Sequence, residues 1–369
     1  MSAPAHDRDV VVVGGGIIGR AVAWQLAERG VDVELLDPDP SRAAAHVAAG
    51  MLAPVSEATP EEGPLAALGL ASAERWPDFV RGLEAAAGQA IDHRAHGTLH
   101  VAVDADAAAE LDELARRLDA MGLETQRLSA TECRDHEPLL APGVRGGLFA
   151  PSDHVVDPRA VMAALALAGQ RAGIVETRAA VTELAGDGIV LEDGSRRTAR
   201  RIVVAAGAWS GAFGLPVHPV RGETLHLAAR DGHEGLGGNV RGIVAGRSVY
   251  LAARRGGRAV VGSTMEELGF DTRARVGAVR QLLADARALV PAIDEYELVE
   301  IAVGLRPASP DNGPLIGHWS PGVIAATGHF RNGILLTPIT VDAVVAMVTG
   351  DPVPPSVTPF DPHRFEPAR

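Results

Sequence analysis

The stretch that decides the fold reads VVVVGGGIIGRAVAWQLAERGVDVELLD and occupies residues 10–37. Its four consecutive valines, Val10–Val13, predict a short strand that is buried on both faces. Apolar residues then recur at roughly helical spacing from Ile17 to Leu26, and a second apolar run ends at Asp37. The stretch therefore predicts a strand–helix–strand unit, as in a parallel sheet covered by helices.

The glycines of this unit have the spacing G-x-G-x-x-G, at Gly14, Gly16 and Gly19. Such glycines allow a tight turn, a close approach of the backbone to a pyrophosphate, and close packing of the helix on the sheet. The free N–H groups and the positive dipole end of the helix then face the phosphates. Asp37 ends the second strand where an acidic residue accepts a hydrogen bond from a ribose hydroxyl. We therefore expect a dinucleotide site here rather than a turn that is merely tight.

The size and composition of the chain narrow the class of protein. Its 369 residues exceed what one hydrophobic core usually supports, so we expect one large and one smaller domain. The net charge of −13 argues against nucleic acid or an anionic membrane surface as a partner. The single cysteine, Cys133, excludes an intrachain disulfide and favours a reducing, cytoplasmic compartment. No apolar signal core begins the chain and no apolar run approaches ~20 residues, so we expect no membrane span.

Further along the chain, buried strands and helices alternate in a pattern typical of the same sheet. The run IVVAA at residues 202–206 predicts a second fully buried strand, which ends on small residues and would pass under a cofactor. Residues 1–50 and 174–210 thus share one sheet, so the cofactor domain is discontinuous in sequence. Periodicity also predicts helices over 65–87, 105–121, 158–172 and 339–349, and strands over 97–103, 175–184, 188–192 and 323–327.

Between residues 216 and 301 the pattern changes to short alternating strands. They lie at 223–228, 249–252, 258–262 and 298–303, and one amphipathic helix at 272–289 interrupts them. Alternation of this kind is typical of an antiparallel sheet that is solvated on one side, and such a sheet suits a substrate domain. The Pro-rich end, residues 352–362, predicts an irregular surface strap or a disordered tail.

Two further segments allow more than one interpretation. The alanine-rich stretch up to Pro54 could lie flat against a ligand, or it could form a helix that Gly50 interrupts. His93, His96 and His100 invite comparison with a metal site. On a strand, however, His93 and His96 face opposite sides, so we expect no metal.

Two arginines stand out because they lie in apolar, turn-rich segments rather than on a charged helix face. Arg306 lies in GLRP, residues 304–307, and Arg331 lies in GHFRNGIL, residues 328–335. A guanidinium in such a setting needs a carboxylate partner, which a substrate could supply. Tyr250, on an alternating strand, and Met265, at a strand end, are further candidates for the same site.

The chain resembles, over nearly its whole length, the glycine oxidase branch of the D-amino-acid oxidase and sarcosine oxidase superfamily of FAD proteins. The resemblance rests on GGGIIG (14–19), AAGML (48–52), VAAGAWS (204–210), PVRGE (219–223), VVGSTM (260–265), GLRP (304–307) and GHFRNGILL (328–336). It implies an α/β fold with a Rossmann-like, glutathione-reductase-type FAD-binding domain at residues 1–90, 151–215 and 306–369. It also implies an α+β substrate domain, built on an antiparallel sheet, at residues 91–150 and 216–305.

For the cofactor, the resemblance implies FAD bound without a covalent link, since no cysteine lies near the C-terminal flavin segments. Val181 matches the residue whose backbone meets the adenine, and residues 329–335 match the turn around the pyrimidine end of the isoalloxazine. The residues that match the family's FAD contacts are Gly14, Gly16, Ile17, Ile18, Gly19, Asp37, Pro38, Ala44, Ala45, Ala49, Gly50, Met51, Val181, Gly207, His329, Phe330, Arg331, Asn332, Gly333, Ile334 and Leu335.

For the substrate, the resemblance assigns Arg306 to a bidentate clamp on a carboxylate, assisted by the hydroxyl of Tyr250. Met265 matches a wall of the pocket and Arg331 a second arginine near the flavin, whereas Ser248 stands where some members have a histidine. The implied reaction oxidises glycine and other small amines, such as sarcosine and small D-amino acids, to the imine and 2-oxo acid. O2 is the implied acceptor and H2O2 the product. A homotetramer and the supply of glycine imine for thiamine thiazole synthesis are also implied.

Other functions fit the sequence less well. A D-amino acid or sarcosine dehydrogenase would keep the fold and pass electrons to a quinone or carrier instead of O2. A flavin-binding sensor without catalysis would not need both Arg306 and Arg331. A NAD-dependent dehydrogenase would seldom need the later glycine segments, and no GxSxG motif of a serine hydrolase is present.

Overall fold

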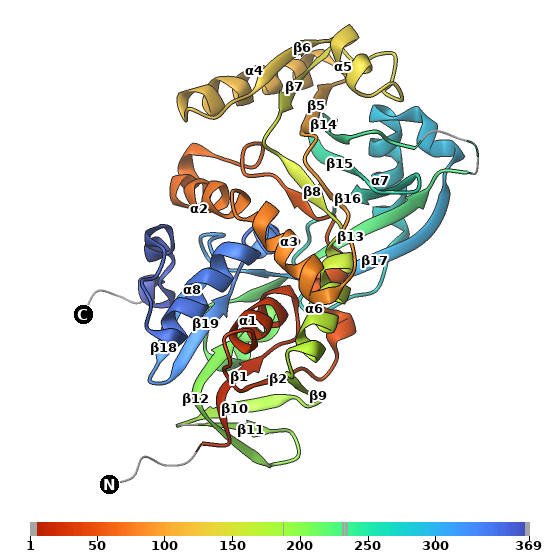
Figure 1. Cartoon of the computed structure of the whole chain (residues 1–369). Coiled ribbons are helices and arrows are strands. Elements are labelled where there is room, and N and C mark those ends of the chain that lie inside the picture. Colours follow the sequence, from red (N-terminus) through yellow and green to blue (C-terminus); the bar gives the residue numbers. More distant parts are fainter. Residues whose placement is uncertain (1–5, 187, 231, 233–234, 366–369) are drawn as a thin grey trace.

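The computed structural model describes residues 6–186, 188–230, 232 and 235–365. The outermost ends of the expected FAD-binding domain, 1–5 and 366–369, lie outside the described residues. Two large sheets dominate the described part, with helices packed on each (Figure 1).

The first sheet is built around β1 (Arg8–Val13), which pairs in parallel with two neighbours. Its order is β10-β11-β12-β1-β2-β9, and β19 and β18 continue it beside β12. Alternate valines of β1 face opposite sides, so Val10 and Val12 join one apolar cluster and Val11 and Val13 another. This explains why four consecutive valines are buried. The other strands are β2 (Val33–Leu36), β9 (Val175–Thr177), β10 (Val181–Ala185), β11 (Gly188–Leu191), β12 (Arg196–Val204), β18 (Leu315–Ser320) and β19 (Val323–Thr327).

Helices cover the first sheet. α1 (Ile17–Ala27) follows β1 and packs between α6 (Pro158–Arg171) and α8 (Thr337–Thr349), as Figure 1 shows. The buried residues of this layer include Trp24 and Leu165. α3 (Trp76–Ala87) packs in turn on α6. The beginning of α1 therefore has a fixed position at the carboxyl end of β1.

The second sheet has the order β17-β13-β16-β15-β14-β5-β7-β6. Its pairs are antiparallel except for β5 and β14, which run parallel. α7 (Val276–Leu289) packs on it through buried residues such as Leu282 and Leu289. The strands are β5 (Thr98–Ala102), β6 (Gln126–Ser129), β7 (Gly146–Ala150), β13 (His218–Ala228), β14 (Asn239–Val244), β15 (Arg247–Ala253), β16 (Arg258–Gly262) and β17 (Glu297–Ala308).

A third, three-stranded sheet has the order β3-β8-β4 and links segments from distant parts of the chain. It consists of β3 (Met51–Leu52), β8 (His154–Val156) and β4 (His93–Arg94). The remaining helices are α2 (Gly63–Ala73), α4 (Ala105–Ala120) and α5 (Ala130–His136).

The predicted fold class is confirmed, and the helices expected over 105–121, 158–172 and 339–349 are present as α4, α6 and α8. The division into two domains stays a prediction, and its expected boundary at 305/306 falls inside β17. Arg306 also lies on this strand, not in a turn as its neighbours Gly304 and Pro307 suggested. Strand pairing with β13 holds the segment extended despite those residues.

Three expected elements differ from the structure, and at the Pro-rich end the structure decides between the two expected alternatives. The periodic stretch 65–87 is two helices, because Pro77 stands in the first turn of α3 and starts a new helix. The expected strand 175–184 is divided into β9 and β10, which pair with different strands. The helix expected from 272 begins only at Val276, because the backbone N–H of Arg275 donates to the Glu223 carboxylate instead. The Pro-rich end forms short 3₁₀ helices anchored by the buried Val357 and Phe360, so it is a strap and not a disordered tail up to residue 365.

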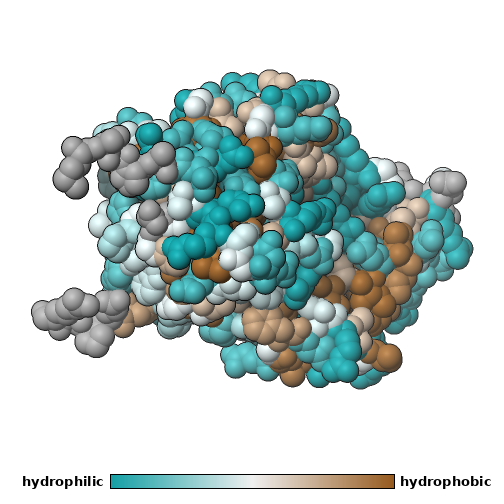
Figure 2. Space-filling view, turned by 90° about the horizontal axis from the view of Figure 1, so that it is seen from below, coloured by the Kyte–Doolittle hydropathy of each residue, from teal (hydrophilic) through white to brown (hydrophobic). Residues whose placement is uncertain are grey.

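The edge strand β17 leaves Leu298, Val299 and Ile301 exposed. Seen from below, apolar residues gather towards the right of the molecule, while the rest of this face is mostly hydrophilic or neutral (Figure 2). Within the described residues, no helix combines the length and the hydropathy that crossing a bilayer requires.

Candidate active site

A cavity of about 620 Å³ is lined by residues of both large sheets. The glycine-rich turn after β1 lies along it, and so do Arg306 from β17 and Tyr250 from β15. The cavity thus brings together the two ends of the site that were predicted separately. Its lining includes Gly14, Gly16, Ile17, Ile18, Asp37, Pro38, Ala44, Ala45, Ala49, Gly50, Met51, Val181, Gly207, Tyr250, Met265, Arg306, His329, Phe330, Arg331, Asn332, Gly333 and Ile334.

Two residues expected to contact the cofactor do not line this cavity. A Cβ on Gly19 would lie 3.1 Å from the carbonyl carbon of Gly14 and nearer still to its oxygen, so Gly19 lets α1 pack closely on the turn. Leu335 is buried, and its carbonyl accepts hydrogen bonds from the Ser72 hydroxyl at 2.7 Å and the Trp76 indole N–H at 2.9 Å. Gly19 and Leu335 thus stabilise the segments that line the cavity without lining it themselves.

The glycine turn suits an anionic group. Gly14 has φ +111°, and a Cβ there would lie 2.6 Å from the carbonyl carbon of Ala205, so only glycine fits. At Gly16, the residue before α1, a Cβ would meet nothing within 4 Å, and no side chain of the described residues caps the helix. The first N–H groups of α1 therefore face the open cavity, as pyrophosphate binding requires.

Asp37 holds the backbone around this turn. Its carboxylate accepts hydrogen bonds from the Gly15 N–H at 2.6 Å and the Asp39 N–H at 2.8 Å. Asp37 also lines the cavity, so further acceptor capacity of the same carboxylate can serve a ribose hydroxyl. The residues present thus fit the pyrophosphate and ribose of FAD.

The Arg306 guanidinium lies at the other end of the cavity, held only by neutral oxygens. Its Nη1 donates to the Thr264 carbonyl at 3.1 Å and the Arg221 carbonyl at 3.5 Å, and its Nη2 donates to the Ser263 hydroxyl at 2.7 Å. No carboxylate among the described residues lies within 4.0 Å of it. Burial lowers the pKa of Arg306, while the nearby Tyr250 and Glu57 act in the opposite direction. Arg306 is thus a cation able to receive an anionic ligand.

The walls around Arg306 come from neighbouring strands. Tyr250 lies across Gly262, where a Cβ would be 2.7 Å from Cε2 of the ring, so glycine makes room for the tyrosine. Met265 lines the cavity although 60% of its surface is exposed, which places it at the mouth. Ser248 also lines the cavity, where its small side chain leaves space.

Sequence reasoning missed a second polar group in this cavity. The Arg241 Nη1 donates to the Glu57 carboxylate at 3.0 Å, and Arg331 lies 4.0 Å from the same carboxylate and 3.6 Å from that of Glu62. Arg241 stands opposite Tyr250 in the pairing of β14 with β15. No strand was expected at β14, and only the pairing register of β14 with β15 brings Arg241 to Tyr250.

Buried Asp153 holds the segment that carries Glu57. Its carboxylate accepts hydrogen bonds from the Val55 N–H at 2.9 Å and from the N–H and hydroxyl of Ser56. Burial raises the pKa of Asp153 to about 6 even though these hydrogen bonds favour the ionised form. The segment around Glu57 is thus fixed from behind.

The C-terminal side of the cavity is the turn that leads into α8. His329 is fully buried there, and its Nε2 lies 3.0 Å from the Thr340 hydroxyl. Burial lowers the pKa of His329 to about 3, so its imidazole is neutral. In the described part of the chain, no group of three or more His, Cys, Asp or Glu residues could hold a metal ion.

The chain matches known flavoproteins over most of its length. The family model described as FAD dependent oxidoreductase matches residues 9–347. The chain is 32% identical to a glycine oxidase of Geobacillus kaustophilus, over 96% of this chain and 95% of that protein. It is also 32% identical to the bifunctional protein ThiO/ThiG of Synechocystis sp., over 97% of this chain but 54% of that protein. The chain thus spans about half the length of the ThiO/ThiG relatives that it matches.

Solved structures agree with the fold. The crystal structure of the G. kaustophilus glycine oxidase superposes with a TM-score of 0.90, covering 98% of this chain and 100% of that one at 32% identity. The structure of iminodiacetate oxidase from Chelativorans sp. BNC1 gives a TM-score of 0.83 at 25% identity, covering 96% of this chain and 98% of that one. The resemblance drawn from the sequence motifs is therefore confirmed at the level of family and fold.

Proposed function

The chain belongs to the family of FAD-dependent oxidoreductases, and from this premise we propose that it oxidises glycine and other small amino acids. The proposed products are the imine, which hydrolyses to the 2-oxo acid and ammonia, and H2O2 formed from O2. The observation that carries the proposal is Arg306, a cavity-lining cation with no carboxylate within 4.0 Å among the described residues. A substrate carboxylate is the partner that such a guanidinium needs.

FAD, when bound, supplies the electron acceptor for oxidation of the substrate's carbon–nitrogen bond. We assign its pyrophosphate to Gly14, Gly16 and the first N–H groups of α1, and its ribose to Asp37. Residues of the segments 44–51 and 329–334 also line the cavity, and these segments are proposed to hold the isoalloxazine. The only cysteine, Cys133, does not line the cavity, which supports a non-covalent flavin.

Arg306 is proposed to bind the substrate carboxylate and so to orient the Cα–H bond. The Tyr250 hydroxyl is proposed to assist Arg306 in binding the carboxylate, because Tyr250 lines the cavity and is close enough to Arg306 to raise the pKa of its guanidinium. Arg306, Arg241 and Arg331 make this end of the cavity cationic, which favours the neutral form of the substrate amine. We therefore assign no general base, and Glu57 serves as the counter-ion of Arg241 and Arg331.

The proposal is tested by reducing the flavin with substrate. Purified yellow protein, mixed anaerobically with glycine, should bleach and regain its colour in air. Sarcosine and D-alanine rank the substrates, and methylamine, which lacks the carboxylate, should bleach it far more slowly. Bleaching without return of colour in air would favour a dehydrogenase with another acceptor. Persistent yellow with every amine would favour the flavin-binding sensor.

Three further assignments are proposals. They are a homotetramer and supply of glycine imine for thiamine thiazole synthesis, which follow from the family resemblance, together with a cytoplasmic location, which rests instead on the single cysteine. The two-domain division also remains a proposal. Size-exclusion chromatography with light scattering tests the tetramer directly.

A further inference from the structure

The segment Arg221-Gly222-Glu223 of β13 lies directly beneath Arg306. Successive residues of a strand face opposite sides, so Gly222 faces the cavity while its two neighbours point away from it. A Cβ on Gly222 would lie 2.6 Å from the Arg306 Cζ, which shows that the guanidinium rests on this glycine. Arg221 and Glu223 are each 0% exposed, and neither lines the cavity.

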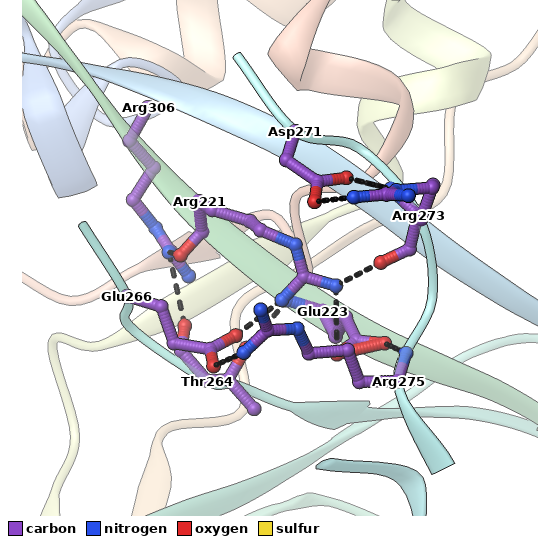
Figure 3. Close-up of polar contacts among 8 residues, drawn as sticks. All are labelled: Arg221, Glu223, Thr264, Glu266, Asp271, Arg273, Arg275 and Arg306. Carbon is purple, nitrogen blue, oxygen red and sulfur yellow. Dashed lines mark hydrogen bonds and ion pairs between the residues drawn. The ribbon is translucent and has the colours of Figure 1, made fainter. Parts of the chain in front are cut away.

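On the far side of β13, Arg221 joins the two ends of one loop, residues 263–275 (Figure 3). Its Nη1 forms a short ion pair with the Glu266 carboxylate near the beginning of the loop. Its Nη2 donates to the Arg273 carbonyl near the end of the loop. The backbones of Arg221 and Glu266 also exchange hydrogen bonds of 2.9 and 3.0 Å. One buried guanidinium therefore closes the loop.

Glu223 completes this closure. Its carboxylate lies 3.0 Å from the Arg221 Nη2 and accepts a hydrogen bond from the Arg275 N–H at 2.8 Å. Its own backbone N–H donates to the Thr264 hydroxyl at 2.9 Å. The Arg275 side chain returns to Glu266 at 3.3 Å. Two carboxylates thus balance the buried Arg221, which is not available to a substrate.

The loop that is closed in this way holds Arg306. Ser263 and Thr264 supply two of the three acceptors of the Arg306 guanidinium, and the Arg221 carbonyl is the third. Met265, from the same loop, lines the mouth of the cavity. A displacement of the loop would therefore move the guanidinium and the mouth together.

We propose that Arg221, Glu223 and Glu266 are positioning residues, which set the carboxylate-binding geometry of Arg306 through the loop 263–275. The proposal rests on the proposed function, because it gives Arg306 the task of holding a carboxylate. It also gives a physical reason for the PVRGE segment: glycine makes room for the guanidinium, and the charged neighbours fix the loop that holds it.

The test uses the FAD-loaded protein and acetate, which offers a carboxylate but no amine to oxidise. Glu266→Gln removes the charge that meets Arg221 and Arg275 but keeps the shape, and Glu266 is 29% exposed, so we expect the variant to fold. We expect its Kd for acetate, measured from the flavin absorbance, and its KM for glycine to rise at least fivefold. Arg221→Lys should act in the same direction. Glu295→Gln, which loses only the exposed pair with Arg230, is the matched control and should leave both constants unchanged.

A double-variant comparison separates positioning from general destabilisation. In an Arg306→Lys background, Glu266→Gln should change the acetate Kd less than twofold, because its effect acts through Arg306. An acetate Kd of Glu266→Gln within twofold of wild type would overturn the proposal, and so would an equal fivefold effect in both backgrounds. If wild-type protein bleaches with glycine while either result holds, the proposed function stands and this inference fails. If wild-type protein neither bleaches with glycine nor binds acetate, the proposed function fails.

Discussion

Gly222→Ala adds one methyl group at a position where the Arg306 guanidinium leaves no room for it. The new Cβ would lie 2.6 Å from the Arg306 Cζ and 2.7 Å from its Nη2, whereas ordinary contact begins at 3.4 Å. The guanidinium must therefore shift by more than about 0.8 Å (3.4 less 2.6), because the Arg306 Nη1 would lie nearer still to the new Cβ. A misplacement of about 1 Å can cost roughly 10²-fold in rate, so we expect kcat/KM for glycine to fall about 100-fold, or about 2.7 kcal/mol.

The assay is anaerobic reduction of the flavin by glycine in a stopped-flow instrument, combined with acetate titration. Gly277→Ala is the control, because a Cβ there, in α7, would meet nothing within 4 Å. The Gly222→Ala protein should retain FAD, since Gly222 is remote in sequence and strand from the glycine turn. A kcat/KM within threefold of wild type, with FAD fully bound, would refute the placement of the guanidinium on Gly222.

Three further predictions address other parts of the site. Arg306→Ala should raise the KM for glycine roughly 100-fold, since it removes ~3 kcal/mol of charge-assisted hydrogen bonding, and Arg306→Lys should restore part of it in steady-state assays. Asp37→Ala should raise the Kd for FAD at least tenfold, measured by flavin fluorescence, because it removes the acceptor of the Gly15 and Asp39 N–H groups as well as the expected ribose contact. Asp153→Asn removes a carboxyl whose pKa burial raises from 3.8 to about 6 in the folded protein. Between about pH 4 and about pH 6, the folded wild type holds a proton on Asp153 that the unfolded wild type has lost. The free energy of unfolding of wild type, measured in urea, should therefore fall relative to that of the variant as pH rises through this range, and the difference should stay constant at higher pH.

The cofactor half of the molecule could be predicted from sequence because its signals are local. A run of valines, a glycine turn, a helix and Asp37 follow one another within residues 10–37, and contacts within this stretch, such as the pairing of β1 with β2 and the hydrogen bond from the Gly15 N–H to Asp37, hold the turn. A buried parallel strand requires apolar residues on both faces, and such a strand can be identified in the sequence as a continuous apolar run. Local signals also predicted α4, α6 and α8, because their apolar residues recur at helical spacing and their ends lie close to the predicted ones.

The substrate half depends on strand register, which sequence alone does not provide. Arg241 reaches Tyr250 only because β14 pairs with β15 in one particular alignment, and a shift of one residue would turn it to the other face. Glu57 comes from a segment far away in sequence, and Asp153 fixes that segment from a third place. The turn formers around Arg306 suggested a loop, whereas pairing with β13 across Val220 and Arg306 makes it a strand. These errors share one cause, namely that long-range pairing overrides local propensity.

The two charged groups of the cavity differ in their partners, and from this difference we expect them to control different parts of substrate recognition. Arg306 lies on a paired strand, its guanidinium rests on Gly222, and it donates hydrogen bonds to three neutral oxygens. This geometry suits the binding of the carboxylate that all amino acids share. Glu57 instead lies on the short segment between β3 and α2 and is the shared counter-ion of Arg241 and Arg331. Because Ser248 is small and lies in the same cavity, we expect selection among side chains and N-substituents to depend on this second group. Substitutions at Ser248 or Arg241 should therefore alter the ranking of glycine, sarcosine and D-alanine, while substitutions around Arg306 should weaken all three alike.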